Sequence, residues 1–341
     1  MIGYIRLNMV RILVSGGAGY VGSALVPKLL KKGHEVIVFD TFWYWESPQE
    51  FLEKTGLQGN KKVKVIKGDL RNRDEVKEAV RGADTVIQLA SISNDPSSSL
   101  DEEFTHSVNY DGNINIIEES KKAGVKRFIY ASSASVYGVK EEPDVTEDMD
   151  LGPLTQYSKL KAEIENYLLN QFDDKFKGVI IRPSTVCGYS PRQRLDVVVN
   201  ILTNFAVNRG KIKVFGGDQL RPNIHIDDMV DLYILLVEID IDKINGRIYN
   251  AGWENLKVID IAKQVKEVVG EVRIEIAPTD DNRSYHISSE KIKRELGFIP
   301  KKTVKDAIRD LKKAFEQGKI PNIDDDSYYN IKRMKRLLGI K

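Results

Sequence analysis

Tyr157 and Lys161 stand four residues apart in the 341-residue sequence, within the segment YSKLK. Residues with this spacing share one face of a helix, so the phenol and the ammonium group can lie together. A free tyrosine side chain has a pKa of about 10, too high for a base at neutral pH, and a nearby cation favours its ionised form. The pair could therefore take the proton of a substrate hydroxyl if a second positive charge lies nearby.

The glycine-rich segment GGAGYVG follows the apolar run ILVS and begins a helical pattern. Gly16 permits a tight turn, Gly19 lets the main chain approach a diphosphate, and Gly22 lets the helix pack on the strand. The first N–H groups of that helix, near Tyr20 and Val21, would face the phosphates. No Lys-Ser/Thr pair follows Gly22, which excludes a P-loop and leaves a dinucleotide site.

Asp40 ends the second apolar run, EVIVFD. A carboxylate there can accept both ribose hydroxyls of an adenosine and would repel a 2′-phosphate, and no arginine directly follows it. This favours NAD over NADP, with a capping role for Asp40 as the alternative. Asp69, after the third run, could accept the adenine amino group or cap the next helix.

Small and polar residues end the next two apolar runs. Leu89, Ala90 and Ser91 end the fourth run, and Ser132 and Ser133 end the fifth. Open parallel sheets bind their ligands at the carboxyl ends of the strands. We therefore expect the nicotinamide ribose to approach these residues.

Apolar runs of strand length alternate with amphipathic stretches through the first half of the chain. This alternation predicts βαβ units, and hence an α/β fold with a Rossmann-type doubly wound parallel sheet. The expected strands are residues 10–15, 35–40, 63–67, 85–90, 127–132 and 177–182. The expected helices are residues 21–32, 74–80, 101–123 and 155–170.

After residue 183 the pattern becomes shorter and richer in turns. We expect residues 1–183 to form the NAD-binding domain, with a returning segment near 224–250. Residues 184–223 and 251–320 would form a smaller C-terminal α/β domain that binds substrate. Residues 321–341 would be a terminal tail with a basic, solvated helix.

Composition excludes several classes of protein. The 52 basic and 50 acidic residues nearly cancel, which argues against a nucleic-acid partner, and no apolar run is long enough to cross a membrane. Cys187 is the single cysteine, so an internal disulfide is impossible and a cytoplasmic location is expected. No metal-ligand spacing appears, and His225, between Ile224 and Ile226, is favoured as a structural strand residue.

Taken in order, these motifs resemble the extended short-chain dehydrogenase/reductase family. The resemblance covers nearly the whole chain and points to the NAD-dependent nucleotide-sugar epimerase and dehydratase branch, to which the UDP-galactose 4-epimerases belong. The segments that carry it are GGAGYVG, GDLRN, VNYDGNINIIE, YASSASVYG, YSKLKAE, RPSTVCG, RPNIHIDDMV and ELGFIP.

The resemblance implies a role for each catalytic candidate. Tyr157 would be the base, Lys161 would hold the nicotinamide ribose and tune Tyr157, and Ser133 would bind the reacting hydroxyl. Asn109 would support the active-site helix, and Pro183 would contact the nicotinamide side. The cofactor site is then expected to comprise Gly16, Gly19, Tyr20, Val21, Gly22, Asp40, Asp69, Leu70, Leu89, Ala90, Ser91, Asn109, Ser132, Tyr157, Lys161 and Pro183.

The same resemblance implies a nucleotide-diphosphate sugar as substrate. Arg221 and Arg283 would bind its diphosphate, since two cations suit that group, and surface ion pairs are the alternative for both. Ser93, Ser133 and Thr185 would also contact the substrate. Many relatives carry asparagine where Thr185 stands and histidine where Gln88 stands.

The leading functional prediction is an NAD-dependent epimerase that acts through a transient keto intermediate. A reductase or oxidase of a nucleotide-linked ketosugar is the alternative enzyme, and a non-catalytic NAD-binding regulator is the alternative of another class. The motifs specify neither the nucleotide and sugar nor the carbon that inverts. A homodimer is expected, paired through the helices at 101–123 and 155–170.

One activity of the branch, 4,6-dehydration, is not expected. Dehydration needs a second acid/base group beside the sugar, and in the dehydratases that the sequence resembles acidic residues directly follow the position of Ser133. Here Ala134 and Ser135 follow it. A carboxylate would have to come from another loop, with Asp95 as the candidate.

Overall fold

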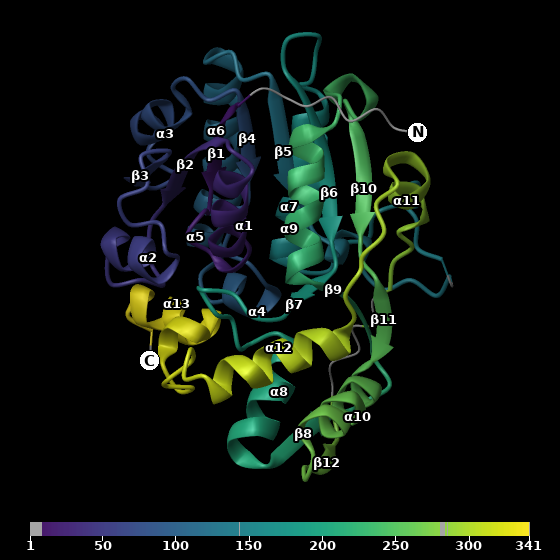
Figure 1. The fold of residues 1–341 in the computed structure, drawn as a ribbon. Helices are drawn as coiled ribbons and strands as arrows, with labels where there is room; N and C mark the ends of the chain where they lie inside the picture. The colour runs from purple at the N-terminus through teal and green to yellow at the C-terminus, as the bar shows by residue number, and fades with distance from the viewer. Residues whose placement is uncertain (1–8, 143, 280–283, 285, 341) are drawn as a thin grey trace.

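A parallel sheet of seven strands forms the centre of the protein (Figure 1). The structure is a computed structural model that describes residues 9–142, 144–279, 284 and 286–340. The strand order is β10-β6-β5-β4-β1-β2-β3, and every neighbouring pair is parallel. The strands are β1 (Arg11–Ser15), β2 (Glu35–Asp40), β3 (Val63–Lys67), β4 (Thr85–Gln88), β5 (Arg127–Ala131), β6 (Lys177–Pro183) and β10 (Arg247–Ala251). This confirms the predicted α/β doubly wound fold.

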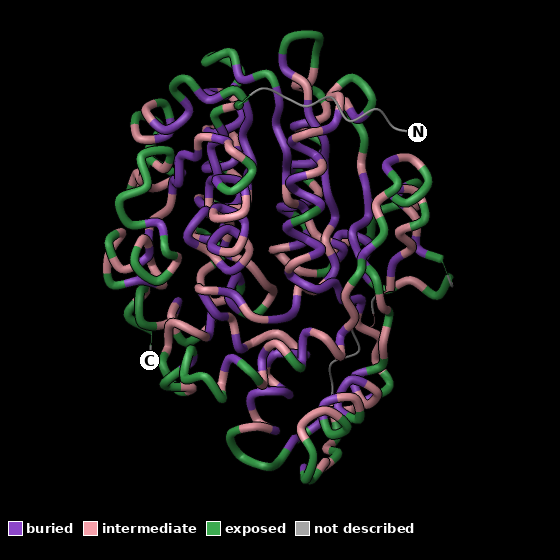
Figure 2. The backbone as a smooth tube through the Cα atoms, in the orientation of Figure 1, coloured by how far each residue is buried: buried purple, intermediate pink, exposed green. Residues whose placement is uncertain are grey.

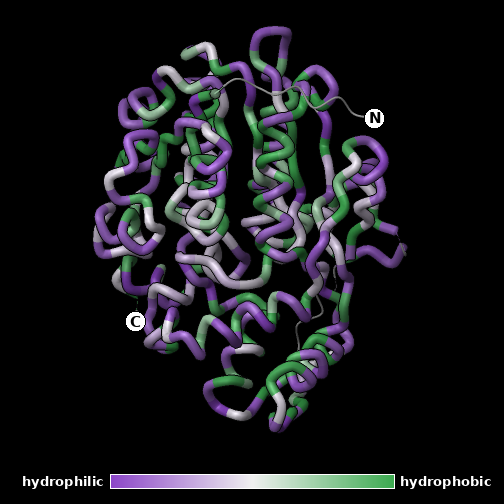
Figure 3. The backbone as a smooth tube through the Cα atoms, viewed as in Figure 1, coloured by the Kyte–Doolittle hydropathy of each residue, from purple (hydrophilic) through white to green (hydrophobic). Residues whose placement is uncertain are grey.

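Helices cover both faces of this sheet, and the central strands are buried on both sides (Figure 2). On one face, α1 (Tyr20–Lys31) packs beside α9 (Ile226–Glu238); on the other lie α3 (Arg73–Val80), α6 (Gly112–Lys122) and α7 (Gln156–Leu169). Double burial explains why these strands are continuous apolar runs, visible as green segments in Figure 3.

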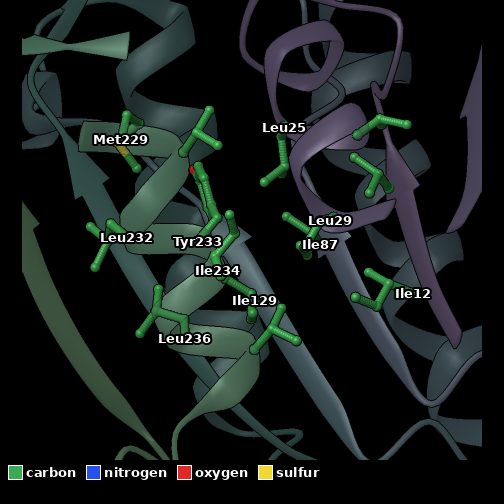
Figure 4. Close-up of a cluster of buried hydrophobic side chains, with 14 of the residues drawn as sticks. Ile12, Leu25, Leu29, Ile87, Ile129, Met229, Leu232, Tyr233, Ile234 and Leu236 are labelled. Atoms are coloured by element: carbon green, nitrogen blue, oxygen red, sulfur yellow. The ribbon is translucent and has the colours of Figure 1, made fainter. Parts of the chain in front are cut away.

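The core between α1 and α9 is drawn in Figure 4. Leu25 and Leu29 of α1 face Tyr233 of α9, above Ile87 and Ile129 of the sheet, and all five are almost fully buried. Burial of one such side chain contributes roughly 1.5–3 kcal/mol to folding. This core fixes the position of the glycine-rich turn that precedes α1.

A smaller unit stands at the carboxyl ends of the sheet strands (Figure 1). Its own core is formed by side chains of three helices and of two small sheets, ordered β11-β9-β7 and β12-β8. The strands are β7 (Thr185–Cys187), β8 (Lys211–Phe215), β9 (Leu220–His225), β11 (Glu254–Lys257) and β12 (Arg273–Ala277). The helices are α8 (Val198–Arg209), α10 (Val258–Val269) and α12 (Val304–Glu316).

The predicted helix over 101–123 is interrupted. The chain forms α5 (Glu102–His106), then a π-helical turn over Ser107–Asp111, and then α6. The remaining α-helices are α2 (Pro48–Lys54), α4 (Asp95–Ser98), α11 (Glu290–Leu296) and α13 (Asn330–Leu338). The expected helix of the tail is thus present, but it is not solvated all round, because Asn330 and Met334 are 3% and 2% exposed. No helix of the described residues has the length and apolar character that a membrane span requires.

Candidate active site

A cavity of about 520 Å³ lies at the carboxyl ends of the sheet strands. The last residues of β1, β2, β5 and β6, namely Ser15, Asp40, Ala131 and Pro183, all line it. The smaller unit contributes the opposite wall. The cavity therefore occupies the position at which open α/β sheets bind ligands.

The glycine-rich turn forms one end of the cavity. Gly16 adopts φ +76°, and a Cβ atom there would lie 2.7 Å from the main-chain nitrogen of Ala90. A Cβ atom on Gly22 would lie 2.3 Å from the carbonyl oxygen of Gly16. Gly19 caps α1 without any side-chain bond to its first N–H groups, so the helix start is open to an anion. This cradle fits the diphosphate of a dinucleotide.

Asp40 holds the turn from the neighbouring strand. Its two carboxylate oxygens accept the main-chain N–H groups of Ala18 at 3.0 Å and of Phe42 at 2.9 Å. Burial raises the pKa of Asp40, while these N–H groups and the charge of Arg192 oppose the rise. Asp40 thus caps the turn and also lines the cavity, and its contact with the ribose stays a prediction.

Asp69 lies at the same end of the cavity and pairs with Arg71 at 2.7 Å. Burial alone would raise the pKa of Asp69, but hydrogen bonds from Arg71 outweigh it and lower the pKa. The cap of α3 is Asn72 and not Asp69. The capping alternative for Asp69 is therefore wrong, and its contact with adenine stays a prediction.

Helix α7 brings Tyr157 to the other end of the cavity. Thr155 caps this helix through its hydroxyl, which accepts the N–H of Ser158. Tyr157 follows in the first turn and lines the cavity, and Lys161 lies one turn later with its ammonium 5.8 Å from the centre of the Tyr157 ring. The predicted helix and its shared face are thus present.

Burial controls the protonation of both residues. It raises the pKa of Tyr157 to about 12, although a hydrogen bond with Ser133 and the charge of Arg194 oppose the rise, and Asp95 adds to it. Burial lowers the pKa of Lys161 to about 7, against the charge of Glu165. Tyr157 alone is therefore a poor base, and bound positive charge is needed to ionise it at neutral pH.

The serines after β5 have different partners. Ser133 shares a hydrogen bond of 2.9 Å with the hydroxyl of Ser135, and both line the cavity beside Tyr157. Ser132 donates to the buried carboxylate of Glu165, which also pairs with Arg182 at 2.6 Å. Ser133 is thus the serine available to a substrate hydroxyl.

Most of the predicted site residues come together in this one cavity. Those that line it are Gly16, Gly19, Tyr20, Val21, Gly22, Asp40, Asp69, Leu70, Leu89, Ala90, Ser91, Ser93, Ser132, Ser133, Tyr157, Pro183, Thr185 and Arg221. Thr185 and Arg221 come from the adjacent strands β7 and β9 of the smaller unit.

Two of the described residues that were predicted, Asn109 and Lys161, do not line the cavity. Asn109 is 2% exposed and holds the loop after β4, since its amide bonds both the N–H and the carbonyl of Ile92, at 2.8 and 3.1 Å. Lys161 lies just beneath the cavity and donates to the carbonyl of Ala131. Arg283 lies outside the described residues.

The sequence alone did not identify Arg192, Arg194 and Asn330, which also line the cavity. Arg194 pairs with Asp196 at 2.6 Å. The only local signal was the pair of arginines in SPRQR, within a stretch that reads as a turn. Nothing in the spacing of these residues shows that they face the glycine-rich turn.

Asp95, the carboxylate considered from the sequence, does reach the cavity. It begins the short helix α4 and follows Asn94, which adopts φ +109°. Its side chain accepts the hydroxyl of Thr155 at 2.6 Å. A carboxylate therefore stands near Tyr157 although none directly follows Ser133 in sequence.

One group of side chains has the spacing of a metal site. Within the described ranges, His225, Asp227 and Asp310 offer ligand atoms within 4.8 Å of one another. The ammonium of Lys302 contacts both carboxylates, at 2.6 and 3.1 Å, and His225 accepts the N–H of Asp227. These contacts form an ion-pair network in which His225 is a buried residue at the end of β9.

A family model and two epimerases match most of the chain. The model of the NAD dependent epimerase/dehydratase family matches residues 12–252. UDP-glucose 4-epimerase 3 of Oryza sativa subsp. japonica is 29% identical over 329 residues, 88% of each chain. UDP-glucose 4-epimerase of Bacillus subtilis (strain 168) is 29% identical over 327 residues, 88% of this chain and 95% of that protein.

The chain is also similar to a solved epimerase structure and to a dehydrogenase. The structure of UDP-glucose 4-epimerase from Thermus thermophilus in complex with NAD has a TM-score of 0.77 and 26% identity, and covers 90% of this chain and 99% of its own. Human sterol-4-alpha-carboxylate 3-dehydrogenase, decarboxylating, is 32% identical over 237 residues, but these are 67% of this chain and 57% of that protein.

Proposed function

The chain belongs to the NAD-dependent epimerase/dehydratase family, and on that premise we propose that it is an epimerase of a nucleotide-diphosphate sugar. NAD is its cofactor. The observation that carries the proposal is that Ser133 and Tyr157 share one cavity with the glycine-rich turn, with Lys161 directly beneath. The UDP-glucose 4-epimerases among its relatives make UDP-sugars the first substrates to test.

The residues of the chain suggest how the reaction proceeds. Tyr157 takes the proton of one sugar hydroxyl as the carbon–oxygen double bond forms, and returns it when the alcohol re-forms with the opposite configuration. Bound NAD supplies the hydride acceptor and donor for that carbon. Ser133 orients the hydroxyl, and protonated Lys161 stabilises the tyrosinate.

The substrate is expected to span both units of the protein. Its sugar would lie between Ser133 and Tyr157, and its diphosphate would approach Arg221 on β9, next to Thr185 on β7. Arginine suits a diphosphate because its planar guanidinium forms paired, charge-assisted hydrogen bonds. Arg283 remains a second candidate for the same group.

The test is incubation of the protein with a panel of UDP-, GDP-, CDP- and dTDP-sugars, with products identified by NMR. An epimerase gives an inverted sugar without net formation of NADH. Tyr157→Phe should remove product formation and retain bound NAD, and Tyr110→Phe, on the outer helices, should retain both. An inverted product from Tyr157→Phe at the wild-type rate would refute the assignment of the base.

A net oxidation or reduction is the second candidate, because the dehydrogenase of sterol carboxylates is also similar. Under that reaction, NADH would accumulate or be consumed in proportion to product. Absorbance of the reduced nicotinamide separates the two. A non-catalytic NAD-binding regulator is disfavoured by the presence of all three residues, Ser133, Tyr157 and Lys161.

We also propose a homodimer through α6 and α7, which rests on the family resemblance. The large apolar side chains of these helices, such as Ile116, Ile164 and Leu168, are buried within one chain. Half-buried Ile114 of α6, with Tyr167 and Leu169 of α7, are among the side chains that these helices leave for a partner. Light scattering at micromolar concentration should give twice the chain mass; a monomer mass would contradict the proposal.

A further inference from the structure

Arg192 is a buried cation that pairs with no carboxylate in the part of the chain that the structure describes. It lies in the turn after β7, is 4% exposed and lines the cavity. Its guanidinium carbon lies 3.6 Å from the centre of the Tyr44 ring, and its Nη2 donates to Asn330 at 2.7 Å. Its Nε has no hydrogen-bond partner among the described residues. The neighbouring Arg194, by contrast, is paired with Asp196.

A buried charge of this kind is costly unless something compensates it. An unpaired ion in a protein interior loses several kcal/mol of solvation, and burial lowers the pKa of Arg192. Stacking on an aromatic ring restores only part of this. A buried guanidinium that lines a cavity and has no carboxylate partner among the described residues therefore points to an anionic ligand.

The position of Arg192 indicates which anion it binds. Its main-chain N–H donates to Ser23 at 3.0 Å, and Ser23 lies in the first turn of α1, directly after the glycine-rich cradle. Asp40, the candidate for the ribose, is also close enough for the charge of Arg192 to stabilise its ionised form. The cofactor diphosphate is the anion expected beside the glycine-rich turn, whereas the substrate diphosphate is expected near Arg221 on β9.

We propose that Arg192 binds the diphosphate of NAD, and that Asn330 of α13 holds it in position. Asn330 is 3% exposed, and besides Arg192 it contacts Ser93 and Asp196, at 3.1 and 2.8 Å. The same helix reaches the carbonyl of Trp43 through Arg333. Helix α13 thus ties together three segments that line the cofactor cavity.

The proposal concerns the cofactor alone, so its test needs no sugar substrate. Adenosine, ADP, NAD and NADP are titrated calorimetrically into the full chain after bound nucleotide has been removed. Arg192→Met should weaken the binding of ADP and NAD by about ten- to a hundredfold, the range of one lost charge-assisted hydrogen bond. Adenosine, which has no phosphate, should bind as before.

Controls separate this effect from misfolding. Arg309→Met removes an exposed arginine of α12 and should change none of the affinities. Arg192→Lys keeps the charge without the planar guanidinium and should lose less affinity for ADP than Arg192→Met. Equal losses for adenosine and ADP, or a loss confined to NADP, would overturn the diphosphate assignment.

The role of Asn330 is tested by a double-mutant cycle. Asn330→Ala should weaken ADP binding a few-fold in the wild-type background and have no effect in the Arg192→Met background, because it acts through Arg192. The same loss in both backgrounds would show that Asn330 does not position Arg192.

Discussion

The ammonium group of Lys161 donates to the main-chain carbonyl of Ala131 at 2.7 Å, and no carboxylate pairs with it in the described structure. The end of β5 thus anchors the cation one helical turn from Tyr157. Burial makes this anchor unfavourable for the charged form, since it lowers the pKa of Lys161 to about 7. Burial of Lys161 therefore lowers the stability of the folded chain at neutral pH.

The first prediction follows from that cost. The unfolded chain binds the Lys161 proton up to about pH 10.5 and the folded chain only up to about pH 7, so stability rises with pH between these values. Lys161→Met removes the cost and should raise the Tm of the cofactor-free protein at pH 7 by several degrees. The difference should shrink as the pH approaches 10.

Lys159→Met is the matched control for this measurement, since Lys159 lies exposed on the same helix. It should leave Tm almost unchanged at both pH values. If the Lys161→Met protein were less stable than wild type at pH 7, burial of the Lys161 ammonium group would not destabilise the folded chain, and the prediction would be wrong. Lys161→Met should also lose catalytic activity by at least about a hundredfold.

A second prediction concerns Asp95. Its charge raises the pKa of Tyr157, so Asp95→Asn should lower that pKa and leave more tyrosinate at a given pH. The acidic limb of the kcat/KM profile should therefore move to lower pH. Glu102→Gln, at an exposed position of α5, should not move it. A profile that shifts to higher pH in Asp95→Asn would be inconsistent with this electrostatic role.

Asp95 also bears on the prediction that the protein does not catalyse dehydration. We expect inversion without loss of water, because Ala134 and Ser135 follow Ser133 where the dehydratases carry acidic residues. The carboxylate of Asp95 is already engaged by Thr155 at the cap of α7. Mass spectrometry of the product decides this: a 4-keto-6-deoxy sugar, one water lighter than the substrate, would refute the prediction and make Asp95 the first candidate for the acid/base role.

The preference for NAD over NADP gives a third prediction. Asp40 lines the cavity with its carboxylate, and a 2′-phosphate would add a second negative charge beside it. Asp40→Ala combined with Thr41→Arg should lower the ratio of the NADP and NAD dissociation constants by about tenfold or more. Thr41→Arg alone serves as the control and should change the ratio less. Wild-type protein that binds NADP as tightly as NAD would refute the assignment.

The fourth prediction concerns the cradle of the diphosphate. Gly22→Ala places a Cβ atom 2.3 Å from the carbonyl oxygen of Gly16, so the turn must move and NAD binding should fall below detection. Gly246→Ala is the comparison: it has positive φ but no described atom within 4 Å of the added Cβ, and should cost only about 1 kcal/mol of stability. Calorimetric titration with NAD distinguishes the two, and tight binding by Gly22→Ala would contradict this account of the turn.

The sheet was predictable because its strands are buried on both faces, which leaves unbroken apolar runs such as EVIVFD in the sequence. The glycine-rich turn was predictable because close packing of Gly16 and Gly22 excludes any side chain. The π-helical turn at Ser107–Asp111 was not predictable in the same way, since such turns are rare single insertions within α-helices.

Arg192 could not be predicted as a site residue for a different reason. Arg192 contacts Tyr44 and Asn330, and both lie far from it in the sequence, one before it and one after it. No local pattern records such a contact, and an arginine in a turn is ordinarily a solvated residue. Its burial, and hence its demand for an anion, exists only in the folded chain.

The contact between Asn330 and Arg192 joins residues that are 138 positions apart. During synthesis the ribosome therefore completes β1 to β6, the glycine-rich turn and the Tyr157–Lys161 helix long before it adds the residue that fixes Arg192. A nascent chain at that stage has six of the seven strands of its sheet and an unfinished wall beside the diphosphate. Capture of the cofactor should then be a late event in biogenesis, which follows translation of Asn330.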